Sequence, residues 1–264
     1  MGPISWLSFT IPKAGNQDIE NEDALFPTSG IGESISGKPS TFIMADGATQ
    51  TSFSGLWARC LIEACADKKL SEPIFLQSIE NARETWLRSF EGKEIPWHAA
   101  EKIRQGAFSA ITWLEIQHLP LHPGYAYSWK ALAVGDCCLF IARNQSIYLS
   151  LPLQNPIDFS LSPTLVPTKR ERLDSIKGKI QTARGSLKSG DQIILTSDAI
   201  AAWIMKQSQL DKLSFLDMIK LIKNAKDGIG FSEWINSLRK SGELKNDDTS
   251  VIYIELGENL NDTK

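Results

Sequence analysis

The stretch Phe42-Ile43-Met44-Ala45-Asp46-Gly47 is the part of the sequence that decides the fold. Its four apolar residues indicate a short buried strand, and the acid and glycine that follow end that strand. The pattern recurs where the largely apolar run 129–134 meets Gly135-Asp136, and where 193–196 meets Ser197-Asp198. We therefore expect several buried strands that each end at a carboxylate.

The order is reversed near the two ends of the sequence. Asn21-Glu22-Asp23 precedes the apolar run 24–26, and Asp247-Asp248 precedes the strand-like run 251–254. Carboxylates held near a low-dielectric core disfavour one another's charge, so a fold that gathers several of them normally neutralises them with a cation. Oxygen ligands alone suit hard ions such as Mg²⁺, Mn²⁺ or Ca²⁺. The alternative is that each aspartate only begins a turn.

Five motifs in chain order strengthen the metal hypothesis: NEDALF, FIMADGA, ALAVGDCCLFIAR, GDQIILTSDA and DDTSVIYIE. Together they resemble the successive motifs of the metal-dependent Ser/Thr protein phosphatases, the protein phosphatase 2C (PPM) family. Each motif is weak alone, but the ordered set is specific and extends from about Leu7 to about Glu255. The resemblance implies an α+β fold in which two packed antiparallel β-sheets are flanked by helix pairs.

Composition sets wider limits. The chain has 264 residues and is 42% hydrophobic, which is enough for a sizeable core, and we expect a single domain over residues 1–264. A formal charge of -3 gives no reason to expect a nucleic-acid or membrane partner. The sequence begins without a signal-peptide pattern, and its four cysteines lack zinc spacing. We expect a cytoplasmic monomer with reduced thiols.

Runs of strands interrupted by pairs of helices favour α+β over alternating βαβ units. Apolar residues at helical spacing predict helices that include 74–90 and 97–118, whereas the glycine-rich segment 30–40 is expected to be a loop. The proline-rich segment 151–169 lacks periodicity and is also expected to be a loop. A loop of this length inside a domain is usually functional or mobile.

The resemblance also implies a catalytic site. In the family, two metal ions, here Mg²⁺ or Mn²⁺, activate a water that attacks a phosphoserine or phosphothreonine of a protein substrate. Asp46 matches the aspartate that bridges the ions, and the Gly47 carbonyl would bind one of them. Glu22 and Asp23 match the acidic pair of the family. Asp136 matches a residue that helps to hold a third, weaker metal in bacterial members, and Asp198 and Asp247 match the remaining aspartate ligands.

Some positions depart from the family pattern. The phosphate-contacting arginine is replaced by Asp18, so Lys13 becomes the candidate cation for the substrate phosphate, although it lacks a bidentate fork. Ala199 stands where relatives carry a glycine that tolerates positive φ. A register one residue earlier would put Asn246 in place of Asp247, which would be a poorer metal ligand.

Three hypotheses follow. The first is an active, divergent bacterial-type phosphatase with specificity for phosphoproteins. The second is a pseudophosphatase that keeps the fold and binds a phosphorylated partner without turnover; Asp18 favours it, and the complete carboxylate set argues against it. The third is a metal-dependent hydrolase of small phosphoesters.

Overall fold

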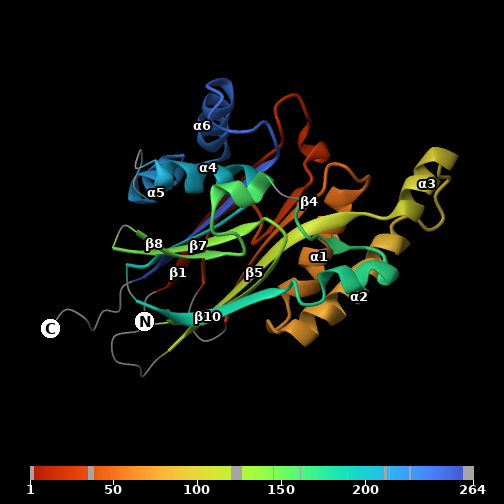
Figure 1. Cartoon of the computed structure of the whole chain (residues 1–264), viewed down its shortest axis with the longest axis horizontal. Helices are drawn as coiled ribbons and strands as arrows, with labels where there is room; N and C mark the ends of the chain where they lie inside the picture. Colours follow the sequence, from red (N-terminus) through yellow and green to blue (C-terminus); the bar gives the residue numbers. More distant parts are fainter. Residues whose placement is uncertain are drawn as a thin grey trace.

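The strands form two antiparallel sheets that pack face to face, as the computed structural model shows (Figure 1). The structure describes residues 3–34, 39–119, 127–144, 146–160, 162–188, 190–210, 213, 215–225 and 227–257. In spatial order the first sheet contains β3 (Gly30–Ser34), β1 (Ile4–Ile11), β12 (Thr249–Leu256), β11 (Gln192–Thr196), β7 (Cys138–Arg143) and β8 (Ser146–Leu151). The second contains β10 (Gln181–Leu187), β6 (Tyr127–Val134), β5 (Phe108–His118), β4 (Ser40–Gly47) and β2 (Asp23–Phe26), and the short β9 (Val166–Pro167) pairs with β5.

Alternation along the strands builds the core between the sheets. In β4, Phe42 and Met44 point to the other sheet, whereas Ile43 and Ala45 point outward. Ile252 and Ile254 of β12 meet them from the opposite sheet. Because both faces of these strands are buried, their sequences are continuous apolar runs without alternation.

Helices cover the two outer faces (Figure 1). α1 (Ser54–Ala66) and α2 (Glu72–Arg88) pack on the sheet of β4 and β5, with Trp57, Phe75 and Trp86 fully or almost fully buried. The other sheet is covered by α4 (Asp198–Gln209), α5 (Phe215–Asn224) and α6 (Gly228–Lys240). This layering confirms the predicted fold class. Short 3-10 helices lie in the connections: η1 (Asp18–Glu20), η2 (Pro156–Ser160) and η3 (Arg170–Ile176).

The prediction of one helix over 97–118 is wrong. Only α3 (Trp97–Gln105) is helical; it projects away from the sheets (Figure 1) and buries no residue, and the second half of the segment is β5. Gly106, at a φ of 81°, ends the helix. β5 is apolar on both faces, because Leu114 and Ile116 face the other sheet and Trp113 faces α1 and α2. Apolar periodicity does not separate such a strand from a buried helix.

The predicted loop 30–40 is also wrong in part. Residues Gly30–Ser34 form β3, an edge strand that pairs with β1. Gly32 lies against the Trp6 ring, where a Cβ atom would approach within 2.1 Å of a ring carbon. Polar and glycine-rich sequence here reflects an exposed edge strand rather than a loop.

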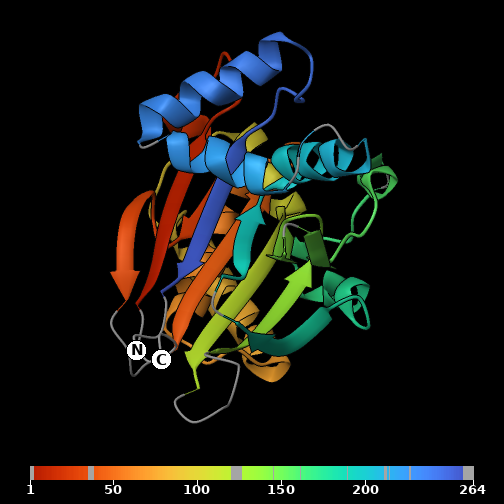
Figure 2. The same cartoon turned by 90° about the vertical axis from the view of Figure 1, so that its left-hand side faces the viewer.

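The two ends of the described chain lie beside each other (Figure 2), and the Gly257 N–H donates to the Pro3 carbonyl at 2.8 Å. Among the described residues, no helix has both the length and the apolar character needed to cross a membrane.

Candidate active site

Aspartates from four separate parts of the fold line one cavity of about 310 Å³. We call it the acidic pocket. Its acidic residues are Asp46, Asp136, Asp198 and Asp247, and the rest of its wall is formed by Gly47, Ala48, Thr49, Gln50, Ser162, Pro163, Leu165 and Lys245.

The ends of buried elements place these four carboxylates. Asp46 is the penultimate residue of β4, and Asp136 follows β6 in a turn. Asp198 is the first residue of α4, where the helix N-terminus favours a negative charge. Asp247 lies just before β12. The sequence pattern of strands ending in acids therefore brings these side chains to one edge of the two sheets.

Gly135 fixes the turn that presents Asp136. Its φ is 105°, a left-handed conformation that favours glycine. A Cβ atom at this position would lie 2.4 Å from the Cβ of Ala110 on β5. Only glycine lets the turn pack this close to the strand.

Asp23 lies beneath the acidic pocket. It is only 6% exposed, and it is paired directly with Asp46 across β2 and β4. The Ser250 hydroxyl donates to its Oδ2 at 2.7 Å, whereas its Oδ1 is buried with no hydrogen-bond partner among the described residues. A buried carboxylate with one unpartnered oxygen is costly in the absence of a cation.

Glu22 differs from Asp23. Its carboxylate accepts a hydrogen bond from the Ser54 hydroxyl at the start of α1, and its own N–H donates to Asp248 Oδ2 at 2.8 Å. Its carbonyl accepts from the Gly47 N–H at 3.1 Å. Of the predicted acidic pair, Asp23 is the member that raises the pKa of Asp46.

Burial and mutual repulsion raise the pKa values of these carboxyls. Burial is the main cause for Asp46, whose pKa is held well above its usual range, and the charges of Asp23, Asp198, Asp136 and Asp247 add to it. Burial and the Asp198 charge raise the pKa of Asp136 to about 7. The pKa values of Asp23 and Asp198 are raised chiefly by burial. The pocket is a concentrated anionic site that favours binding of a cation.

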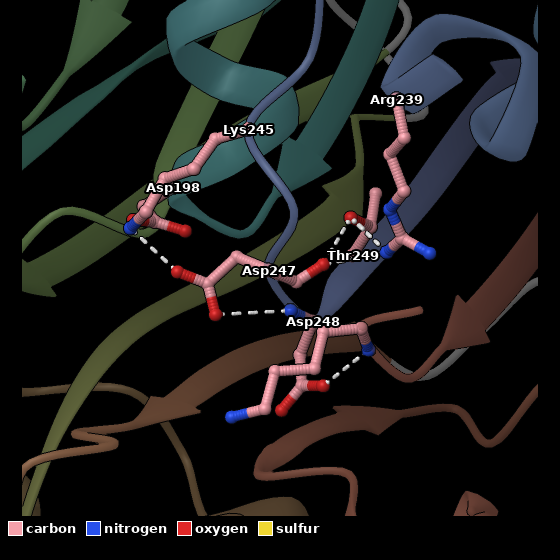
Figure 3. A network of polar contacts seen from close by, with 7 residues as sticks. Asp198, Arg239, Lys245, Asp247, Asp248 and Thr249 are labelled. Atoms are coloured by element: carbon pink, nitrogen blue, oxygen red, sulfur yellow. Dashed lines mark hydrogen bonds and ion pairs between the residues drawn. The ribbon is translucent and has the colours of Figure 1, made fainter. Parts of the chain in front are cut away.

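One cation of the chain already lies there. The Lys245 ammonium is 2.5 Å from Asp247 Oδ2 and 3.5 Å from Asp198 Oδ2, which places Lys245 and Asp198 on the same side of Asp247 (Figure 3). Partial burial alone would lower the pKa of Lys245, but the two carboxylates outweigh it and raise that pKa. Lys245 is thus charged and neutralises part of the pocket.

Three consecutive residues next to Lys245 have different partners. Asn246 exchanges hydrogen bonds with the backbone of Ala14, Asp247 faces the acidic pocket, and Asp248 accepts the backbone N–H groups of Lys13 and Glu22 at 2.8 Å each. The structure therefore places Asp247 in the pocket, and not Asn246.

Arg239 of α6 holds the backbone of the same segment. Its Nη2 donates to the Asp247 carbonyl at 2.5 Å and to Thr249 Oγ1 at 3.1 Å (Figure 3). Its Nη1 donates to the Pro12 carbonyl at 3.0 Å. Arg239 consequently links the Asp247 backbone to the segment that follows β1.

Solved structures share this arrangement of sheets and helices. The serine/threonine phosphatase PstP/Ppp of Mycobacterium tuberculosis matches with a TM-score of 0.61 and 11% identity, over 97% of this chain and 100% of that chain. The PP2C phosphatase domain with a regulatory fragment of SpoIIE from Bacillus subtilis matches with a TM-score of 0.54 and 15% identity, over 98% and 65%. The chain has the protein phosphatase 2C fold.

A structure of the PstP catalytic domain in complex with two manganese ions matches this phosphatase 2C fold with a TM-score of 0.59 and 11% identity, over 98% of this chain and 100% of that one. No protein-family model and no curated protein matches the sequence. At identities of 11 to 15%, the structural similarity shows the fold alone, and any activity has to be argued from the residues of the site.

The donor chemistry of the acidic pocket fits a hard divalent ion. All its acidic groups offer oxygen ligands. The adjacent Asp23 Oδ1 is a buried acceptor to which no group in the described part of the chain donates a hydrogen bond. As the side chains stand, no three acidic, histidine or cysteine side chains within the described ranges converge closely enough to hold an ion. The carboxylates whose oxygens could serve as ligands of such an ion are those that line the pocket, namely Asp46, Asp136, Asp198 and Asp247.

Lys13 lies on another cavity of this phosphatase 2C fold. That cavity has about 960 Å³ and runs between the segment after β1 and α6, with Asp18, Arg239 and Asn246 also on its wall. It shares no lining residue with the acidic pocket. The role of Lys13 in phosphate binding stays a prediction that this placement does not favour.

Ala199 needs no positive φ in this chain. It lies in the first turn of α4, which begins at Asp198 directly after Ser197. The non-glycine residues with positive φ among those described are Phe53 and Asn144. Alanine is thus compatible with the local backbone.

Sequence reasoning missed several residues of the pocket wall, namely Thr49, Gln50, Ser162, Pro163, Leu165 and Lys245. Ser162, Pro163 and Leu165 belong to the predicted loop 151–169. This segment is anchored next to Leu165, where the Trp57 indole N–H donates to the Val166 carbonyl at 2.9 Å. Lys245 had a recognisable signal, since it stands two residues before Asp247. A cation that close to a candidate ligand is an obvious partner for it.

Proposed function

We propose that this chain is a divalent-metal-dependent phosphatase that hydrolyses phosphoserine or phosphothreonine in a protein substrate. The observation that carries the proposal is the acidic pocket, where Asp46, Asp136, Asp198 and Asp247 meet above the buried Asp23. The phosphatase 2C fold of the neighbours, one of which holds two manganese ions, supports the same assignment.

Bound Mg²⁺ or Mn²⁺ would supply a water acidified at neutral pH and would neutralise the charge of the transferring phosphoryl group. The residues of the chain prepare the pocket for this. Asp46 is held by its own strand and by the Ser109 hydroxyl, which donates to its carbonyl at 2.9 Å. Asp198 is steadied by the N-terminus of α4, and the backbone of Asp247 by Arg239.

Phosphate release from p-nitrophenyl phosphate and from a phosphothreonine peptide tests the proposal. We expect release with Mn²⁺ or Mg²⁺ and none with EDTA. Asp46→Asn and Asp198→Asn should each lower kcat at least about 100-fold, because each removes a charged ligand of the metal. Lack of metal-dependent release from every substrate would contradict it. Release from a sugar phosphate but not from the peptide would favour the hydrolase of small phosphoesters.

A second candidate function is a pseudophosphatase that binds a phosphorylated partner without turnover. Lys245 favours it, because an internal ammonium neutralises Asp198 and Asp247, as does Asp18 at the position of the phosphate-contacting arginine. Binding of a phosphopeptide without phosphate release at saturating Mn²⁺ would distinguish it from the enzyme.

We also propose a cytoplasmic location and a monomeric state, with a phosphorylated protein as the partner and no nucleic-acid or membrane partner. The cysteines support a reducing compartment, since Cys60, Cys65, Cys137 and Cys138 are buried free thiols.

A further inference from the structure

The Lys245 ammonium has two ion-pair partners among the described residues, and both belong to the acidic pocket. Asp247 Oδ2 is 2.5 Å away and Asp198 Oδ2 is 3.5 Å away. The ammonium comes from the solvent side, since the Lys245 side chain is 66% exposed whereas each aspartate side chain is 21% exposed. A positive group of the chain therefore lies where these two carboxylates would accept a metal ion.

We propose that Lys245 is a built-in counter-ion that competes with a divalent metal ion for Asp198 and Asp247, so that metal loading requires the ammonium to leave. This inference rests on the proposed function, because it assumes that the two aspartates bind the metal. Occupancy of the site would then depend on whether the metal concentration is high enough to displace the ammonium.

The fold lets the ammonium leave without moving the aspartates. Arg239 holds the Asp247 carbonyl, and Asp248 is hydrogen-bonded to the backbone of Lys13 and Glu22. The segment after α6 is thereby anchored, whereas Lys245 has a flexible four-carbon stem that is mostly in solvent. Rotation of this side chain alone would free both carboxylates.

Competition has two measurable consequences. Metal binds only the state in which the ammonium has left, so the apparent affinity falls by the fraction of molecules in that state. A state populated in one molecule in ten would weaken binding about tenfold. In the absence of metal, the ammonium reduces repulsion between Asp198 and Asp247 and stabilises the fold.

Mn²⁺ titration by calorimetry, together with thermal unfolding in EDTA and in Mn²⁺, tests the inference. Lys245→Met removes the charge and keeps much of the stem, and Lys245→Arg keeps the charge. Lys177→Met is the matched control, because Lys177 also forms a 2.5 Å ion pair, with Asp174, but on the surface at 75% exposure.

We expect Lys245→Met to bind Mn²⁺ about tenfold more tightly than the wild type. Its Tm should be lower in EDTA and should rise more on addition of Mn²⁺. Lys245→Arg should bind Mn²⁺ as weakly as the wild type, and Lys177→Met should match the wild type in every measurement.

Equal or weaker Mn²⁺ binding by Lys245→Met would overturn the inference and leave the proposed function intact. Tighter binding without phosphatase activity in any of the proteins would support the inference and contradict the proposed function. Absence of Mn²⁺ binding by all four proteins would overturn both.

Discussion

Asp23 and Asp46 are directly paired across the antiparallel strands β2 and β4, so the buried carboxylate of Asp23 and the partly buried carboxylate of Asp46 are neighbours on the same face of one sheet. Like charges that are directly opposite on a sheet are destabilising. Here burial adds to the effect, and the pKa of both carboxyls is raised. The arrangement lowers the stability of the metal-free fold and prepares the site for a cation.

Asp46→Asn should therefore stabilise the metal-free protein while abolishing turnover. The amide keeps the shape and removes one of the two charges. At pH 8 in EDTA we expect the free energy of unfolding to rise, because burial and the neighbouring aspartates oppose the charge that the substitution removes. Urea denaturation measures it. A variant less stable than the wild type would show that the Asp46 charge does not oppose folding.

The stability of the metal-free protein should fall as the pH rises through neutrality. The pKa of Asp136 is about 7 in the folded state against an ordinary value of 3.8. A raised carboxyl pKa stabilises the fold fully below the ordinary value, and this stability is lost as the pH rises through the folded-state value. Between pH 5 and pH 8 the loss from Asp136 should be about 2 to 3 kcal/mol.

Asp136→Asn isolates the contribution of this group. In EDTA, the free energy of unfolding of this variant minus that of the wild type should increase by the same amount from pH 5 to pH 8. A difference that does not change with pH would contradict the raised pKa of Asp136.

Gly47→Ala should destabilise the protein through a close approach of backbone to backbone. A Cβ atom at Gly47 would lie 2.6 Å from the Ser54 carbonyl carbon, where α1 begins. Overpacking of this kind costs about 1 to 3 kcal/mol. Gly228→Ala is the control, because nothing lies within 4 Å of its added Cβ and its φ is not positive. Denaturation midpoints would contradict the prediction if both variants unfolded alike.

The sequence predicted most of the fold because its strands end in recognisable signals. Acids and glycines marked the ends of β4, β6 and β11, and these positions lie together in the structure. The failure at β5 has a physical cause. A strand packed between a sheet and a helix layer is apolar throughout, so its sequence has no period of two that would distinguish it from a helix.

The aspartates that line the acidic pocket were predicted from the sequence, but its cation, Lys245, was not. The pattern of strand ends gives Asp46, Asp136 and Asp198, because each follows from local sequence alone. The pairing of Lys245 with Asp198 depends on two segments that are 47 residues apart in the chain. Local patterns contain no information on such a contact, although the proximity of Lys245 to Asp247 in sequence was visible.

A substitution of Lys13 can distinguish binding of the substrate phosphate from binding of the rest of a substrate peptide. Lys13 lines the larger cavity, whose wall includes Asn246, and the next residue, Asp247, lines the acidic pocket. Consecutive residues of one backbone segment thus line the two cavities. If the phosphate enters the acidic pocket, Lys13 is placed to contact a neighbouring part of the peptide.

Lys13→Ala should therefore raise KM for an acidic phosphopeptide by about threefold or more and leave KM for p-nitrophenyl phosphate unchanged. Loss of one exposed ionic contact is worth up to about 1 kcal/mol, and kcat should not change because the contact is made equally in the ground and transition states. Steady-state kinetics with both substrates measures this. A KM raised equally for both substrates would instead place the ammonium at the phosphate, and a KM unchanged for both would exclude Lys13 from substrate binding.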